Sequence, residues 1–78
     1  MDREVFYSRL AEILQLPADQ FAAGGRRLPA EPDSVILLDI MALVDEMTGV
    51  TLSPEAIKSA KSADAILEMT AQATLGTG

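Results

Sequence analysis

Apolar residues recur at helical spacing in four segments of the chain, and none of these segments alternates convincingly as a strand. The expected helices cover about residues 2–15, 34–48, 54–60 and 63–73. The intervening stretch 16–33 contains three prolines and a pair of glycines, so we expect it to be a long loop. Residues 74–78 are expected to be a flexible tail. The pattern therefore predicts an all-α fold of four helices, with a long loop between helices 1 and 2.

The second expected helix has two distinct faces on a helical wheel. Its core face consists of Ile36, Ile40, Leu43, Val44 and Met47, with Leu37 beside it. Its opposite face consists of Val35, Leu38, Asp39, Ala42, Asp45 and Glu46. An acidic surface with an apolar centre is typical of a helix that docks transiently on partners. Scattered apolar residues on a surface are also normal, so this feature alone leaves both interpretations open.

Composition narrows the functional classes that the chain can belong to. The 78 residues suffice for a single domain, and they include neither histidine nor cysteine. The chain therefore lacks the commonest general base and the thiolate ligands of metal sites, so we expect no enzyme and no metal. A net charge of −6 disfavours nucleic acid and favours basic protein partners.

The sequence also bears on the compartment. No apolar run reaches the roughly 20 residues that would span a membrane, so we expect no membrane partner. The first four residues lack the basic start and apolar core of a signal peptide, which predicts a cytoplasmic protein.

The pair Asp33-Ser34 lies at the expected start of the second helix, with Asp33 as the predicted N-cap. Backbone N–H groups without partners and the positive end of the helix dipole would stabilise a phosphodiester attached to Ser34. The hydroxyl would also be accessible to another enzyme at this junction between loop and helix. The simpler alternative is that one of the two residues merely caps the helix.

A wider stretch around this pair resembles the acyl carrier protein family. It runs from Asp33-Ser34-Val35-Ile36-Leu37-Leu38-Asp39-Ile40 to Val50-Thr51-Leu52-Ser53-Pro54-Glu55. The family pattern opens a long helix with Asp-Ser-Leu, places acidic residues on its outer face, and continues with a short apolar link and two further helices. The resemblance continues without a gap from Asp33 to about Ala60, and the order of the other segments agrees.

The resemblance implies a right-handed four-helix bundle of acyl-carrier type, which is a monomer and has no catalytic residues. It implies that Ser34 carries 4′-phosphopantetheine, transferred from coenzyme A by a phosphopantetheinyl transferase, with Asp33 beside it. The thiol of the arm would hold acyl intermediates as thioesters and present them to acyltransferase, ketosynthase or adenylating and ligase enzymes. The outer face listed above would dock on these partners. A cargo channel would run near Leu37, Val44, Ala60 and Ala63.

Some positions depart from the family pattern. Val35 and Ile36 stand where fatty-acid carriers usually have leucine and an acidic residue, and Glu31-Pro32 replaces the glycines of peptidyl carriers. These departures favour polyketide or another specialised biosynthesis over housekeeping fatty-acid synthesis. An aminoacyl or peptidyl carrier of a nonribosomal peptide pathway is the alternative within the family. An acidic helical domain for protein interactions, with Ser34 as a cap only, is the alternative outside it.

Overall fold

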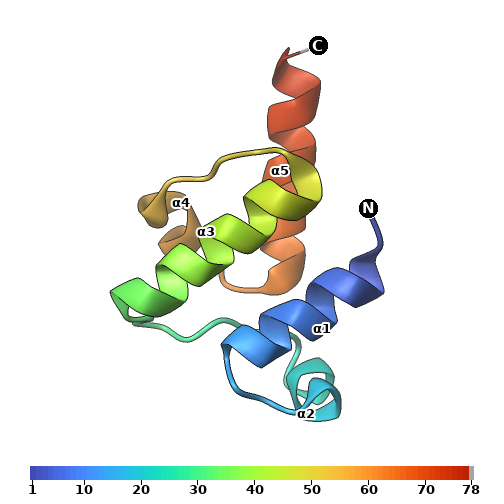
Figure 1. Ribbon diagram of the computed structural model, residues 1–78, viewed down its shortest axis with the longest axis vertical. Helices are drawn as coiled ribbons and strands as arrows, with labels where there is room; N and C mark the ends of the chain where they lie inside the picture. Colours follow the sequence, from blue (N-terminus) through green and yellow to red (C-terminus); the bar gives the residue numbers. More distant parts are fainter. Residues whose placement is uncertain (78) are drawn as a thin grey trace.

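The computed structural model describes residues 1–77, and for residues 74–77 it describes the helical backbone but not the side chains. Five helices follow one another: α1 (Arg3–Ile13), α2 (Ala18–Ala23), α3 (Ser34–Thr48), α4 (Pro54–Ser59) and α5 (Ala63–Thr77). In Figure 1, α1 and α3 lie side by side in opposite directions, and α5 crosses behind α3. The described residues contain no strand, only an isolated bridge between Arg27 and Ser62.

The expected four helices are all present, but α1 ends at Ile13 instead of about 15, α5 ends later than expected, and one loop assignment was wrong. The stretch 16–33 is not without structure, because α2 occupies its first half and buries Phe21 against α1. A helix of six residues shows less than two turns of periodicity, so a sequence pattern cannot identify it reliably. Helix α5 continues to Thr77, past the expected end at 73. Of the expected tail, only residue 78 lies outside the described residues.

The helix ends carry residue types that are favoured at caps, including the predicted N-cap Asp33. The side chains of Asp2, Asp33 and Ser53 accept hydrogen bonds from backbone N–H groups in the first turns of α1, α3 and α4. The Ser62 hydroxyl does the same at the start of α5, with Ala65 N–H as its donor at 3.2 Å. Helix α3 ends at Gly49, whose φ of 74° is a left-handed conformation that glycine adopts without steric cost.

The core lies between α1, α3 and α5, with α4 and α2 at its edges. Its largest fully buried side chains come from four helices: Phe6, Leu10, Ile40, Val44, Ile57 and Ile66. On α3 the buried face is centred on Leu37, Ile40, Leu43 and Val44, whereas Ile36 is only partly buried. The expected core face is therefore confirmed at Ile40, Leu43 and Val44, while Ile36 and Met47 lie at its margin. On α5 the buried stripe consists of Ala63, Ile66, Leu67 and Thr70, and Ala73 beyond it is exposed.

The loop that follows α2 is attached to the connection between α4 and α5. The Leu28 N–H donates to the Lys61 carbonyl at 3.0 Å, and the Ala63 N–H donates to the Arg26 carbonyl at 2.9 Å. The Arg26 guanidinium also lies over the ring of Tyr7, 4.0 Å from its centroid. These contacts hold a long loop against the body of the protein and fix the direction from which the chain enters α3.

Tyr7 itself connects α1 to the start of α5. Its hydroxyl donates a hydrogen bond to Asp64 and accepts one from Arg3 at 3.3 Å. The hydrogen bond to Asp64, followed by partial burial, raises the pKa of Tyr7 above its ordinary value. The tyrosine therefore keeps its proton and serves as a donor that joins the two helices.

Candidate functional site

Ser34 and Asp33 have different roles at the start of α3. Asp33 is the N-cap, and its carboxylate accepts a hydrogen bond from the Ile36 N–H at 2.9 Å. Ser34 is the first helical residue, and its side chain is exposed. Its hydroxyl forms no hydrogen bond with any of the described residues. The helix thus receives its cap from the aspartate, and the serine hydroxyl has no structural role there.

Two backbone N–H groups at the start of α3 have no hydrogen-bond acceptor among the described residues. The carboxylate of Asp33 occupies the N–H of Ile36, and the carbonyl of Asp33 occupies the N–H of Leu37 at 3.0 Å. The N–H groups of Ser34 and Val35 have no acceptor among the described residues. Two such donors at the positive end of a helix of 15 residues favour an anionic group placed beside them.

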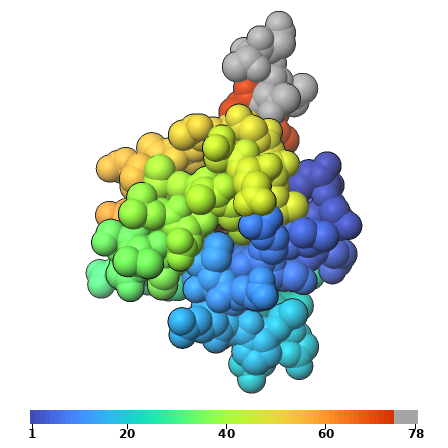
Figure 2. All heavy atoms as spheres, in the orientation of Figure 1, coloured from blue at the N-terminus to red at the C-terminus, as the bar shows by residue number. Residues whose placement is uncertain are grey.

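The outer face of α3 carries two large apolar side chains that nothing covers. Val35 is 65% exposed and Leu38 is 61% exposed, more than any other large apolar side chain among the described ones. They lie one turn apart, on the same face as Ala42 and Asp39, which are also exposed. In Figure 2 this part of α3 forms the green surface above the blue atoms of α1. The predicted docking residues therefore form one continuous surface that begins at Ser34.

The three carboxylates of the predicted docking face differ in their surroundings. Asp39 is exposed and forms no ion pair among the described residues. Asp45 is also exposed, and it accepts a hydrogen bond from the Thr51 hydroxyl at the long distance of 3.5 Å. Glu46 instead binds Arg9 of α1 through both of its oxygens, at 2.8 and 3.1 Å.

The ion pair changes the acidity of Glu46. The hydrogen bond from Arg9 and then its charge lower the pKa of the Glu46 carboxyl below its ordinary value. The glutamate stays ionised, but the adjacent guanidinium neutralises much of its field. Glu46 therefore contributes less negative potential to the outer face than the unpaired Asp39 does. Arg9 lies 37 positions away in the chain, and no local pattern indicates that the two residues meet.

A shallow groove between α1 and α3 extends the outer face. It has a volume of about 290 Å³, and the α3 residues Asp39, Ala42, Leu43 and Glu46 line one side. The other side consists of Arg9, Glu12 and Ile13 from α1. These three were not predicted as site residues. The helical wheel of α1 places Glu12 on the solvent side, but it gives no indication of which helix lies beside it.

The four residues of the expected cargo channel are all buried. Leu37 and Val44 of α3 pack in the core with Ala60 and Ala63 from the two ends of the α4–α5 connection. Ala60 also lines an open cavity of about 600 Å³, whereas the other three do not line that cavity. The sequence thus identified residues on the inner side of the fold, and one of them reaches a hollow in the surface.

Searches for other kinds of site, and for known relatives, give negative results. Within the described residues, no cluster of acidic side chains has the arrangement of a metal site. None of the helices in that part of the chain is long and apolar enough to cross a membrane. No family model matches the chain, and neither the curated proteins nor the solved structures contain a match.

Proposed function

We propose that this protein is a carrier whose Ser34 bears a 4′-phosphopantetheine arm and that it presents acyl groups, bound as thioesters, to partner enzymes. One observation carries the proposal: Asp33 caps α3, while the adjacent Ser34 hydroxyl is exposed and has no hydrogen-bond partner among the described residues. The cap does not need the serine hydroxyl, which is therefore available for modification. The two spare N–H groups at this helix end would stabilise the phosphodiester.

The arrangement of helices supports the proposed family. Helices α1, α3, α4 and α5 have the order and relative lengths that the resemblance to acyl carrier proteins implies. We propose that these four form the bundle of that family and that α2 is a short addition within its long first loop. The resemblance of the sequence around Asp33-Ser34 is the basis for the phosphopantetheine itself.

The outer face of α3 supplies the proposed docking surface. Exposed Val35 and Leu38 lie beside the attachment point, and Asp39 and Asp45 provide negative charge that no cation among the described side chains pairs with. Apolar contact would set how long a partner stays bound, and the carboxylates would attract basic partners. The proposed partners are a phosphopantetheinyl transferase and cytoplasmic enzymes that load, extend or ligate acyl groups in polyketide or other specialised biosynthesis.

Mass spectrometry of the protein after incubation with coenzyme A and a promiscuous phosphopantetheinyl transferase tests the proposal. We expect the mass of one phosphopantetheine to be added to each chain, and peptide fragmentation to locate it at Ser34. Ser34→Ala should abolish the addition. The matched control is Ser8→Ala, because Ser8 is also an exposed serine in a helix, and this variant should be modified like wild type.

The exposed Val35 and Leu38 also favour a second candidate, a domain that binds proteins without any modification. In that case the wild-type protein would gain no mass in this experiment, although its circular dichroism would show a folded helical chain. Modification of the Ser34→Ala variant would contradict the site assignment while leaving a carrier function possible elsewhere in the chain.

A further inference from the structure

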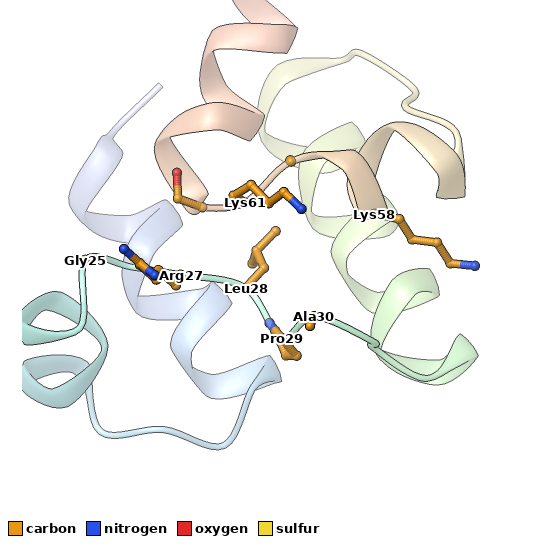
Figure 3. Close-up of a pocket in the computed structure, with 9 residues that line it drawn as sticks. Gly25, Arg27, Leu28, Pro29, Ala30, Lys58 and Lys61 are labelled. Atoms are coloured by element: carbon orange, nitrogen blue, oxygen red, sulfur yellow. The ribbon is translucent and has the colours of Figure 1, made fainter.

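The open cavity beside Ala60 lies between the loop after α2 and the connection from α4 to α5. It has a volume of about 600 Å³. Its lining consists of Gly25, Arg27, Leu28, Pro29, Ala30, Lys58, Ala60, Lys61 and Ser62. Figure 3 shows Leu28 pointing from the loop toward the α4–α5 connection, with Pro29 and Ala30 next to it. The lining therefore combines a hydrocarbon floor with cationic side chains.

The two walls of the cavity are joined to each other. The backbone hydrogen bonds from Leu28 to Lys61 and from Ala63 to Arg26 hold the loop against the α4–α5 connection. Four of the lining residues lie within the two bonded segments, 26–28 and 61–63, and three more lie directly beside them. The cavity is thus part of the folded structure and does not need a ligand to form it, which lowers the cost of binding.

The basic side chains that are not engaged elsewhere all line this cavity. Three of the six basic side chains of the chain are engaged elsewhere: Arg3 with Asp64, Arg9 with Glu46, and Arg26 on the ring of Tyr7. The other three are Arg27, Lys58 and Lys61, and all of them line the cavity. None of these three has an ion pair among the described residues, and no aspartate or glutamate lines the cavity.

The three cations are not equally placed. In Figure 3 the ammonium of Lys61 lies above Leu28, over the cavity. Arg27 and Lys58 extend away on opposite sides, so their stems border the cavity while their charges are turned outward. Lys61 is therefore the cation positioned to meet a ligand, and the other two add to the positive potential at the rim.

We propose that this cavity binds the far end of an acyl group that carries a terminal carboxylate and is attached through the arm on Ser34. The proposal rests on the proposed carrier function. The apolar residues Leu28, Pro29 and Ala60 would contact the hydrocarbon stem, and Lys61 would pair with the carboxylate. Ala30 precedes Ser34 by four residues, which separates the two by at most about 14 Å along an extended chain. A long flexible arm on Ser34 can span such a distance.

The test compares two acyl groups of the same shape and different charge. The transferase loads Ser34 with glutaryl-phosphopantetheine or with 5-methylhexanoyl-phosphopantetheine, in which an isopropyl group replaces the carboxylate. Amide NMR spectra report on Leu28, Ala60 and Lys61 in each form. We expect larger shifts of these amides in the glutaryl form. Raising the salt to about 1 M, where the screening length falls to about 3 Å, should remove the difference.

Variants of the three basic residues identify which cation pairs with the glutaryl carboxylate. Lys61→Gln should reduce the glutaryl-dependent shifts to those of the 5-methylhexanoyl form, because it removes the charge and leaves the backbone bond to Leu28. Arg27→Gln and Lys58→Gln should reduce them less. Arg9→Gln is the control, since Arg9 also loses a charge but lies in the groove between α1 and α3, and it should leave the shifts unchanged. Since the cations are accessible to solvent, we expect population changes of at most about fivefold.

A parallel titration separates this proposal from the carrier function. The glutaryl and 5-methylhexanoyl thioesters of N-acetylcysteamine, which mimic the end of the arm, are added to the unmodified protein. If Ser34 cannot be loaded, the carrier function fails, and shifts of the cavity amides by the glutaryl thioester alone would still support an anion site. Equal shifts by both acyl groups, or shifts that persist in Lys61→Gln, would overturn the site whether or not Ser34 is loaded.

Discussion

The two faces of α3 present the same helix in opposite surroundings. On the inner face, Ile40 and Val44 are fully buried among side chains from α1, α4 and α5. On the outer face, Val35 and Leu38 are among the most exposed apolar residues of the described chain. Similar aliphatic side chains therefore lie only a few positions apart with entirely different contacts. The inner face stabilises the fold, whereas the outer face is available for a partner without cost to the fold.

The same contrast holds between neighbours at the start of the helix. Asp33 contributes its side chain to the cap, and Ser34 contributes only its backbone. Residues that stabilise the fold thus alternate along α3 with residues whose side chains have no structural role. Variants at adjacent positions can therefore separate an effect on stability from an effect on recognition.

The largest difference in the free energy of unfolding should appear between the variants Ile40→Ala and Leu38→Ala. Truncating the buried Ile40 should lower the free energy of unfolding by about 2–5 kcal/mol, since it removes apolar contacts and leaves a cavity. Truncating the exposed Leu38 should change it by no more than about 0.5 kcal/mol. Urea denaturation followed by circular dichroism measures both. Equal losses in the two variants would contradict the assignment of inner and outer faces.

Charge reversal on the outer face should slow the encounter with a partner. Asp39→Lys combined with Asp45→Lys should lower kcat/KM for loading by the transferase about tenfold, because electrostatic attraction acts mainly on association. Glu46 is left unchanged, since replacing it would also break its contact with Arg9.

The control for this experiment reverses two exposed carboxylates away from the outer face. Asp19→Lys in α2 with Glu68→Lys in α5 gives the same net charge and should change loading much less. Steady-state kinetics across a salt series provide the measurement. If both double variants were slowed equally, net charge rather than the face of α3 would govern the encounter.

The next largest effect is the difference in stability loss between the variants Asp33→Ala and Ser34→Ala. Asp33→Ala removes the side-chain cap of α3 and should cost about 1 kcal/mol of stability, within the usual range of about 0.5–2 kcal/mol. Ser34→Ala removes no hydrogen bond and should stay within about 0.5 kcal/mol. Thermal and chemical unfolding of unmodified protein provide the comparison. A larger loss in Ser34→Ala than in Asp33→Ala would return the capping role to the serine and remove the main support for the carrier function.

Local chemistry explains why much of the fold was predictable. The starts of α3, α4 and α5 depend on Asp33, Ser53 and Ser62, each of which bonds to a backbone group within three residues. The end of α3 depends on Gly49, for a reason that concerns one residue alone. Such features can be identified from a few consecutive letters, and the prediction that Asp33 caps α3 is confirmed.

Contacts between distant segments could not be predicted in the same way. Helix α2 exists because Phe21 packs in the core, and its six residues have little periodicity of their own. The cavity beside Ala60 requires a loop and the α4–α5 connection to meet. Arg26 lies on the ring of Tyr7 and Arg27 borders this cavity, and no local pattern around the two arginines indicates either neighbour. Only the folded chain shows these neighbours.

The smallest expected effect belongs to the ion pair between Arg9 and Glu46, which also joins distant segments. Both side chains are accessible to solvent, so their contact should add little stability and weaken further as salt rises. The lowered pKa of Glu46 fixes the direction of its pH dependence. In the unfolded chain the glutamate has its ordinary, higher pKa, so acid protonates the unfolded state first and favours it. The contribution is therefore complete at neutral pH and disappears as the pH falls through the lowered pKa of the folded protein.

A double-mutant cycle with Arg9→Gln and Glu46→Gln, measured by urea denaturation at neutral and at acidic pH, should show coupling only at neutral pH. Coupling of equal size at both pH values would show that the two side chains interact through packing and not through charge. The outer face would then present three carboxylates of equal strength, and Glu46 would rejoin Asp39 and Asp45 as a docking residue.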